Sequence, residues 1–214
     1  MDDLYEKRKK LVKRLQRDGR ILSAQVAKSF IEIPRELFVP KQIERSAYID
    51  QPLKIGHNQT ISAPHMVAIM VEELKILPGQ IILEIGTGSG YHAAIVSNLV
   101  GKNGHVYSIE RIPSLAASSK ENLLKAHISN VTVICSDGSE GLEKHAPYDR
   151  IYVTCAAPKI PDPLVQQLKE NGILLVPVGD RFCILQRVIK QNDQIHIDHL
   201  GGCAFVPLIG KHGF

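Results

Sequence analysis

The stretch LEIGTGSGY (residues 83–91) joins an apolar run to the start of an expected helix through Gly86, Gly88 and Gly90. Glycines allow a sharp turn and a close approach of the backbone to a ligand, and the N-terminus of the helix presents unpaired N–H groups. A dinucleotide fingerprint has the spacing G-x-G-x-x-G, whereas this loop reads G-x-G-x-G, and no G-K-[S/T] of a triphosphate site follows. The loop therefore predicts a cradle for a small ligand at the mouth of an α/β sheet.

Apolar runs alternate with amphipathic segments on both sides of this loop, from residue 79 onward. Such alternation is typical of a parallel sheet with helices on both faces. The last two runs are separated only by the polar turn KQNDQ, which predicts antiparallel strands at the sheet edge. The sequence thus predicts an α/β fold with a doubly wound, mostly parallel, seven-stranded, Rossmann-like sheet. The runs cover residues 81–85, 106–109, 131–135, 151–155, 173–178, 183–189 and 195–200, with helices expected at 89–100, 113–126 and 161–169.

The first 78 residues precede this alternation and are expected to form helices. Leucine and valine recur at helical spacing near the N-terminus, opposite a face rich in lysine and arginine. Ser23 is placed to cap a second helix that ends near Glu32. We therefore expect an N-terminal helical cap over residues 1–78 and a ligand-binding domain over residues 79–214, packed together as one compact unit.

A polar, turn-rich loop is expected at residues 51–62, QPLKIGHNQTIS. Ser62 then stands where an N-cap is favoured, and Pro64 is suited to the first turn of a third helix. Ser62 and Pro64 therefore predict a helix start directly after the loop.

The net charge of +4 comes from 26 Lys and Arg residues against 22 Asp and Glu residues. The first twenty residues hold eight basic and four acidic side chains, so the rest of the chain is neutral. An excess confined to one helix favours a solvated helix face over a nucleic-acid partner. The chain has no run of about 18 apolar residues and no secretory signal, so we expect no membrane segment and a cytoplasmic location.

The four cysteines are spaced 20, 28 and 20 residues apart without a C-x-x-C pair. This is neither zinc-ligand spacing nor the pattern of a small disulfide scaffold, so we expect buried, reduced core thiols. His57 and His65 have no cluster of partner ligands beside them, so no metal site is predicted. The cysteines are Cys135, Cys155, Cys183 and Cys203.

Three acidic residues fall at the ends of successive predicted strands, where parallel strands line one crevice. Glu84 precedes the glycine loop, and Glu110 ends the second strand, where an acidic side chain can accept both hydroxyls of a ribose. Asp137, followed by Gly138, ends the third strand and could face an adenine amino group. A ligand with a cationic group and a ribose but no phosphate suits this lining, and S-adenosylmethionine is such a ligand.

Several motifs of the chain closely resemble the protein-L-isoaspartate O-methyltransferases, a family of class I enzymes that depend on S-adenosylmethionine. The resemblance covers nearly the whole chain, and the segment QTIS-x-P is its most specific part. The motifs are IPRELFVP (33–40), QTISAPHMVA (59–68), LEIGTGSGY (83–91), VYSIERIP (106–113), APYDRI (146–151), AAPKIP (156–161) and FVPL (205–208).

The resemblance implies a protein-repair methyltransferase that methylates the free α-carboxylate of L-isoaspartyl residues and releases S-adenosylhomocysteine. The methyl ester would re-form a succinimide and then partly normal Asp. The implied partners are damaged proteins and peptides, not nucleic acid or membrane; the oligomeric state stays open, with a monomer favoured. Ser62 is the implied active-site residue, in the substrate loop with Thr60, and Phe205 and Val206 would pair with the substrate backbone. The implied cofactor residues are His65, Glu84, Gly86, Gly88, Gly90, Glu110, Asp137 and Gly138.

Three alternatives remain at this point. A hydrolase with Ser62 as nucleophile and His65 as base lacks a G-x-S-x-G elbow. An NAD-linked oxidoreductase and a non-catalytic adenosyl-binding module are also open. The chain departs mildly from the family pattern at Ser136, at His92, and at the pair His57-Asn58, which stands where glycines are common. Asn tolerates left-handed backbone better than most residues, so the loop shape can survive there.

Overall fold

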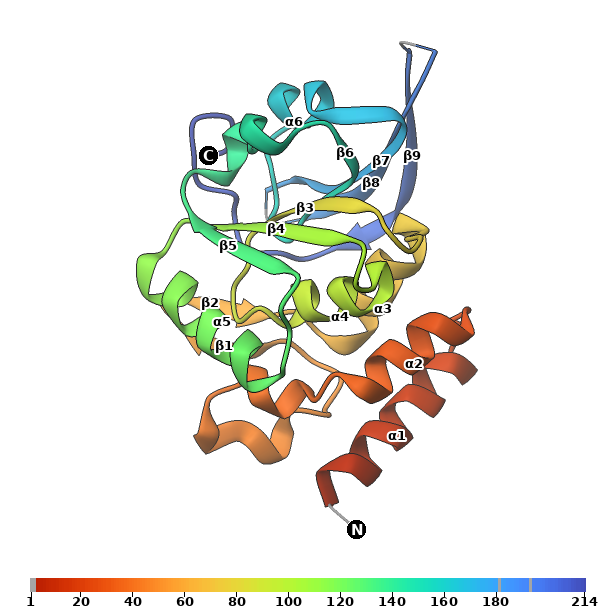
Figure 1. Cartoon of the computed structure of the whole chain (residues 1–214), viewed down its shortest axis with the longest axis vertical. Helices are drawn as coiled ribbons and strands as arrows, with labels where there is room; N and C mark the ends of the chain where they lie inside the picture. Colours follow the sequence, from red (N-terminus) through yellow and green to blue (C-terminus); the bar gives the residue numbers. More distant parts are fainter. Residues whose placement is uncertain (1–2, 181, 193) are drawn as a thin grey trace.

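A seven-stranded sheet runs through the middle of the computed structural model, which describes residues 3–180, 182–192 and 194–214 (Figure 1). Its strand order is β5-β4-β3-β6-β7-β8-β9. The first five of these are mutually parallel, and β8 and β9 extend the edge through antiparallel pairing. The predicted fold class is therefore confirmed. The strands are β3 (Ile81–Ile85), β4 (His105–Glu110), β5 (Val131–Cys135), β6 (Tyr148–Val153), β7 (Leu168–Gly179), β8 (Cys183–Gln191) and β9 (Gln194–Cys203).

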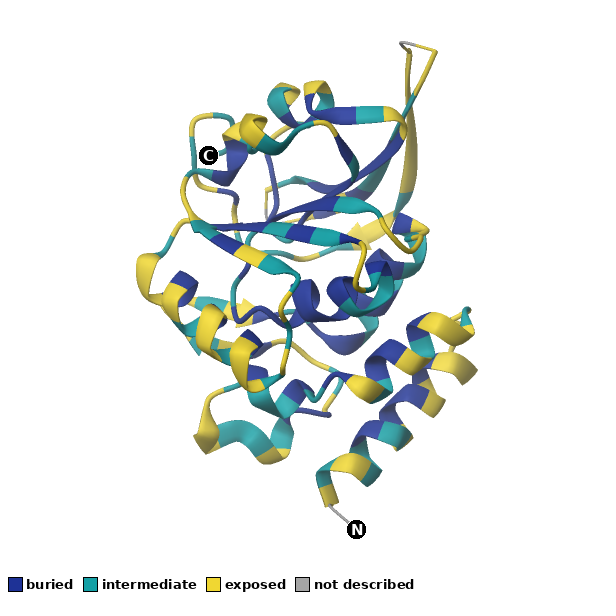
Figure 2. Ribbon diagram, viewed as in Figure 1, coloured by how far each residue is buried: buried dark blue, intermediate teal, exposed yellow. Residues whose placement is uncertain are grey.

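Both faces of the central strands β3 and β6 and of the middle of β7 are buried, which explains their continuous apolar runs, whereas the edge strand β9 is mostly exposed (Figure 2). In β3, Ile82 points into one hydrophobic core, whereas Leu83 and Ile85 belong to the other. The first core is covered by α3 (Pro64–Leu74), α4 (Tyr91–Val100) and α5 (Pro113–Lys125). The second is covered by α6 (Asp162–Gln166) and by the chain end around Leu208. Two 3₁₀ turns, η3 (Gly138–Glu140) and η4 (Glu143–His145), precede β6.

The N-terminal helices α1 (Asp3–Arg17) and α2 (Ala24–Glu32) lie side by side on the α4 side of the sheet (Figure 1). Leu15 of α1 and Ile95 of α4 are buried in the same hydrophobic core. The predicted N-cap of α2 is confirmed, because the Ser23 hydroxyl accepts a hydrogen bond from the Val26 N–H at 3.2 Å. Two 3₁₀ helices follow, η1 (Arg35–Phe38) and η2 (Lys41–Ser46). Within the described ranges, no helix combines the length and apolarity that a membrane span needs.

The structure differs from the expected elements near β7. The helix predicted over 161–169 is only the short α6, because β7 begins at Leu168 and pairs there with Tyr148. Both side chains are buried, at 1% and 0% exposure, so this extra pairing is driven by core packing that local periodicity does not show. The predicted antiparallel run at 183–200 is confirmed, and Asp193 of the predicted turn lies outside the described residues.

A short hairpin occupies the segment predicted to be a loop. Strands β1 (Leu53–Gly56) and β2 (Gln59–Ile61) pair antiparallel. His57 and Asn58 both have left-handed backbone, with φ of 51° and 57°, as the two central residues of a type I′ hairpin turn require. Nε2 of His57 lies 2.8 Å from the Ser114 hydroxyl of α5, which ties the hairpin to the main domain.

Two further expectations are corrected. The N-cap of α3 is Ala63 and not Ser62, and no side chain caps that helix. The expectation of four buried thiols is wrong for Cys135, which is exposed at the end of β5, whereas Cys155 and Cys183 are buried and Cys203 is half-buried. Cys135 closes a strand that lies at the outer edge of the sheet, where less of the chain covers it.

Candidate functional site

A cleft opens at the carboxyl ends of β3, β4 and β6, where ligands bind in open α/β sheets. Strand β2 and the following Ser62 supply residues 59–62, the glycine loop supplies 85–89, and the end of β4 supplies 109–112. The chain end supplies residues 206–209. Four segments that are distant in sequence thus surround one site.

The glycine loop has a shape that only glycine adopts easily. Gly86, Gly88 and Gly90 all have positive φ, at 94°, 54° and 90°. A Cβ at Gly86 would lie 2.3 Å from Oγ1 of Thr154, which is closer than atoms can approach. The Gly86 N–H donates to the Ile109 carbonyl at 2.8 Å, and the Thr154 hydroxyl donates to the Gly86 carbonyl at 2.6 Å. The loop is therefore fixed against both β4 and β6.

Glu110 joins the glycine loop to the wall of the cleft. Its Oε2 accepts from the Gly88 N–H and its Oε1 from the Ile112 N–H, both at 2.9 Å. The side chain lines the cleft and is almost fully buried. A carboxylate has about four lone-pair sites, so each oxygen retains capacity for a ligand hydroxyl. This arrangement fits the predicted binding of a ribose.

Glu84 lies beneath the loop and does not line the cleft. The Ser108 hydroxyl donates to Glu84 Oε2, and the Thr87 and Ser108 hydroxyls are 2.6 Å apart. Burial raises the pKa of the Glu84 carboxyl to about 8, although the Ser108 hydrogen bond acts in the opposite direction. These contacts connect Thr87, in the loop, to the core of the sheet through a carboxyl that is neutral at pH 7.

We expect Glu84→Gln to weaken the pH dependence of stability. The folded carboxyl keeps its proton up to about pH 8, whereas the ordinary value is 4.5, so its contribution is complete below pH 4.5 and is lost as the pH rises through 8. A neutral amide of the same shape does not titrate. Urea unfolding should therefore show a steeper fall in the free energy of unfolding between about pH 5 and about pH 8 for the native chain than for the variant.

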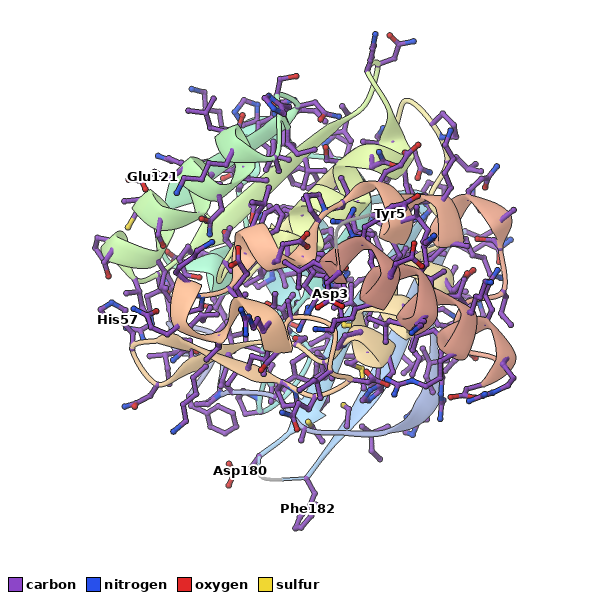
Figure 3. The ribbon with its side chains drawn as sticks, turned by 90° about the horizontal axis from the view of Figure 1, so that it is seen from below. Asp3, Tyr5, His57, Glu121, Asp180 and Phe182 are labelled. Atoms are coloured by element: carbon purple, nitrogen blue, oxygen red, sulfur yellow. The ribbon has the colours of Figure 1, made fainter. Side chains whose placement is uncertain are left out.

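The exposed Glu121 of α5 provides the control, because Glu121→Gln removes a carboxyl from solvent (Figure 3). That variant should retain the pH dependence of the native chain. Parallel stability curves for the native chain and Glu84→Gln would contradict the prediction.

Ser62 lies on the cleft wall, with its backbone held by a buried arginine. The Arg35 Nη2 donates to the Ser62 carbonyl at 2.8 Å, and Nε donates to the Ala47 carbonyl at 2.9 Å. Arg35 is fully buried and stacks 4.9 Å above the Tyr91 ring. Burial lowers its pKa to about 10, so the guanidinium stays charged at neutral pH. The Ser62 hydroxyl neither caps α3 nor shows a hydrogen bond within the described ranges, which makes it available to a ligand.

His65 does not line the cleft and is held by Asp50. Both the His65 backbone N–H and its Nδ1 lie 2.9 Å from Asp50 Oδ1, and Arg14 lies 3.3 Å from the other carboxylate oxygen. In the part of the chain that the structure describes, no hydrogen bond connects His65 with Ser62. The geometry therefore does not form the nucleophile and base pair of a hydrolase.

Asp137 supports the cleft from behind rather than lining it. Its Oδ1 accepts from the Ser139 N–H and hydroxyl at 2.8 and 2.7 Å, and its Oδ2 accepts from the Lys211 N–H at 2.8 Å. Partial burial raises the pKa of Asp137, but the hydrogen bonds from Lys211 and Ser139 outweigh it and lower the pKa overall. The adjacent Gly138 does line the cleft, where a Cβ would lie 2.5 Å from Cγ2 of Ile85.

The predicted site residues divide into three groups by position. Thr60, Ser62, Val206, Gly86, Gly88, Glu110 and Gly138 line the cleft. Glu84, Gly90 and Asp137 do not line the cleft, but each is adjacent in sequence to a residue that does. His65 and Phe205 lie outside it, and the half-buried Phe205 packs against the core instead.

Sequence reasoning missed three residues that shape the cleft: Arg35, Thr154 and His92. Arg35 lies inside the motif IPRELFVP, and Thr154 follows the end of a parallel strand, so a sequence feature could have identified each of them as part of the site. His92 was noted only as a departure from the family pattern. Burial lowers the pKa of His92 to about 3, so the ring is neutral where it packs 4.5 Å from the Tyr152 ring.

The parallel sheet, the glycine loop and the acidic end of β4 together define a class I, S-adenosylmethionine-dependent methyltransferase. The model of one family, described as protein-L-isoaspartate(D-aspartate) O-methyltransferase, matches residues 6–213. The chain belongs to this family.

Relatives in other organisms carry the same name. The protein-L-isoaspartate O-methyltransferase of Methanosarcina mazei is 51% identical over 97% of this chain and 85% of its own length. That of Pyrococcus horikoshii is 48% identical over 99% of this chain and 97% of its own length. A crystal structure from Plasmodium falciparum, assigned to the same activity and solved with S-adenosyl-L-homocysteine, superposes with a TM-score of 0.85 at 30% identity. It covers 94% of this chain and 98% of its own.

Proposed function

We propose that this chain transfers the methyl group of S-adenosylmethionine to the free α-carboxylate of L-isoaspartyl residues in damaged proteins and peptides. The methyl ester then closes to a succinimide, which partly reopens to normal Asp. The observation that carries the proposal is the Ser62 hydroxyl, which lines the same cleft as the glycine loop and makes no hydrogen bond among the residues that the structure describes. The relatives named for this activity support the substrate.

The residues present fit the cofactor. Gly86 and Gly88 line the cleft with backbone alone, Glu110 can accept from ribose hydroxyls, and Gly138 borders the same space. Glu84, Gly90 and Asp137 hold this wall from behind. When bound, S-adenosylmethionine supplies an electrophilic methyl group on a sulfonium. Within this proposal His65 acts indirectly, by anchoring the start of α3 to Asp50.

Positioning of the substrate dominates the proposed mechanism. An α-carboxylate with an ordinary pKa of about 3.5 is ionised at neutral pH, so it needs no strong general base. Ser62 and Thr60 present hydroxyls that orient the carboxylate and replace part of its water shell. Alignment of a weak nucleophile of this kind can lower a barrier by roughly 7–11 kcal/mol.

The chain end provides the surface for the substrate backbone. The Ala156 N–H donates to the Val206 carbonyl at 2.8 Å, and the Leu208 N–H donates to the Ala156 carbonyl at 2.7 Å. This pairing keeps the segment extended along the cleft. Since the Phe205 side chain packs against the core and the Val206 carbonyl accepts from Ala156, we assign substrate pairing to the main chain at Phe205, with Val206 fixing the segment to the sheet; main-chain pairing suits diverse flanking sequences.

The direct test is transfer of labelled methyl groups from S-adenosylmethionine to a peptide that contains isoaspartate. The same peptide with normal Asp is the control and should stay unlabelled. Equal labelling of both peptides would contradict the proposed substrate. Titration with NADH in parallel tests the NAD-linked oxidoreductase, because tight binding of NADH alone would contradict a methyltransferase. Binding of S-adenosylmethionine without transfer to either peptide would favour the non-catalytic adenosyl-binding module.

Ser62→Ala should reduce kcat by roughly ten- to a hundredfold, because it removes a hydroxyl that orients the carboxylate. The Kd for S-adenosylmethionine should stay nearly unchanged in calorimetry. Ser118→Ala, which removes a hydroxyl from α5 outside the cleft, should leave both constants unaltered. A large loss of cofactor affinity in Ser62→Ala would instead place Ser62 in the cofactor site.

Asp137→Ala should weaken cofactor binding and leave kcat nearly unchanged, the reverse of Ser62→Ala. Loss of the carboxylate frees the Ser139 and Lys211 N–H groups and loosens the turn that presents Gly138. Charge-assisted hydrogen bonds of this kind predict a Kd for S-adenosylmethionine about tenfold higher, with kcat at saturating cofactor changed by less than about threefold. An unchanged Kd would show that the turn keeps its shape without Asp137.

A cytoplasmic location, a monomeric state and the division at residue 78 stay predictions. Size-exclusion chromatography with light scattering measures the oligomeric state directly. Expression of residues 79–214 alone tests whether the N-terminal cap is needed for folding.

A further inference from the structure

Cys183 and Cys203 face each other across the two edge strands. They are direct partners in the β8–β9 pairing, and their Sγ atoms are 3.5 Å apart. The Cys183 thiol also points at the Cys203 carbonyl, with 3.0 Å between the sulfur and the oxygen. We propose that these two cysteines are an oxidative modification site, and that their disulfide fastens the end of β9 to β8 beside the cleft.

The backbone already has the spacing that a disulfide needs. Directly opposed residues of an antiparallel pair have Cα atoms about 4.5–5.5 Å apart. Disulfides span Cα separations of about 4.4–6.8 Å. The bond therefore requires rotation of two side chains and no shift of the strands.

The surroundings indicate which sulfur reacts first. Cys183 is 2% exposed, whereas Cys203 is half-buried. The partly exposed Cys203 is therefore the sulfur that a small oxidant reaches first, although Phe182, next to Cys183, projects into solvent at the tip of the β7–β8 hairpin (Figure 3). Burial and the neighbouring Cys183 thiol raise the pKa of Cys203 to about 12. Because the thiolate is the reactive form, oxidation is slow at neutral pH.

The reaction balances with a small disulfide such as oxidised glutathione as the oxidant. The Cys203 thiolate attacks one glutathione sulfur, which forms a mixed disulfide and expels one glutathione thiolate. Cys183 loses its proton to solvent and attacks Sγ of Cys203, which expels the second glutathione thiolate. The two protein thiols are oxidised, and one glutathione disulfide is reduced to two thiols.

The position of the bond gives it a consequence for the cleft. Cys203 follows Gly201 and Gly202, which have no side chains that could pack against the rest of the protein. Gly201 also has a φ of 130°, which favours glycine. Three residues after Cys203, Val206 reaches the cleft wall and pairs with Ala156. A disulfide at Cys203 therefore restrains the stretch of chain that leads from β9 to residues 206–209 on the cleft wall. This inference does not depend on the identity of the methyl acceptor.

The test uses the full chain with Cys135→Ser, which removes the exposed thiol. After incubation with excess oxidised glutathione, the intact mass should fall by two hydrogen atoms. Alkylation of the unfolded chain should then add one group, at Cys155, and a peptide map should link Cys183 to Cys203. The melting temperature should rise by about 5–10 °C, as expected for a disulfide that closes a loop of this size. Hydrogen exchange at residues 204–209 should slow.

Single variants in the same background provide the matched controls. Cys183→Ser should acquire one glutathione at Cys203 without the rise in melting temperature, and Cys203→Ser should form no intramolecular link. The native chain shows whether the oxidant is active, because its exposed Cys135 should be fully modified by glutathione. The proposal is overturned if Cys183 and Cys203 stay reduced or take up glutathione separately while Cys135 reacts. A link without slower exchange at 204–209 would overturn the fastening role.

Discussion

Gly86→Ala should abolish measurable binding of S-adenosylmethionine and lower the free energy of unfolding by roughly 2–5 kcal/mol. The backbone at Gly86 has a φ of 94°, which an L residue adopts only with strain. The new Cβ would also lie 2.3 Å from Oγ1 of Thr154. The loop must therefore move away from β6, which removes the cradle and the hydrogen bond to the Gly86 carbonyl. Calorimetric titration and urea unfolding measure the two effects.

Gly79→Ala is the matched control for backbone strain. Gly79 has a φ of 84°, and a Cβ there would meet nothing within 4 Å, so this variant should cost only about 1–2 kcal/mol and keep cofactor binding. Combining Gly86→Ala with Thr154→Ala removes the closest clashing atom and should restore part of the stability. Gly86→Ala with unchanged affinity would contradict the role of the loop as the cradle.

Arg35→Met should lower kcat/KM for an isoaspartyl peptide by about a hundredfold, because a displacement of about 1 Å at a reacting centre has effects of this size. The guanidinium holds the Ser62 carbonyl and the Ala47 carbonyl together in a fully buried position. Methionine fills a similar volume but donates no hydrogen bond, so the loop that carries Ser62 loses its anchor. The fall should appear mainly in kcat, and Arg35→Lys should recover part of it.

Arg150→Met separates positioning from general stability. Arg150 is also a nearly buried arginine whose side chain donates to backbone carbonyls, including that of Leu74 at 2.6 Å. Its acceptors Leu74, Asp149 and Lys75 do not line the cleft, whereas Arg35 holds Ser62, which does. This variant should lose stability while retaining kcat/KM once it is folded. Equal losses of kcat/KM in both variants would contradict a specific role for Arg35.

Much of the fold could be predicted because burial on both faces of a parallel sheet leaves a direct trace in the sequence. β3 and its neighbours appear as continuous apolar runs, and the polar turn before residue 195 marks the antiparallel edge. The β1–β2 hairpin escaped prediction because it is polar and depends on left-handed backbone at His57 and Asn58. The early start of β7 depends on Tyr148, which is distant in sequence from Leu168.

The part of the candidate site that is formed by short sequence motifs could be predicted. The glycine loop and Glu110 lie together because consecutive parallel strands end at the same edge. Ser62 as an N-cap was wrong, because Ser62 and Ala63 both precede Pro64 and only the backbone geometry distinguishes them. The pairing of His65 with Asp50, and of Arg35 with Ser62, results from tertiary packing that sequence spacing does not encode.

The order in which the cleft segments leave the ribosome has a consequence for the timing of activity. Residues 59–62 and the glycine loop are synthesised early, whereas residues 206–209 follow only after β8 and β9. A nascent chain therefore holds the residues of the glycine loop well before it holds those of the chain end. Translation must pass residue 209 before the cleft has all of the segments that line it, so catalytic competence cannot precede the synthesis of that residue.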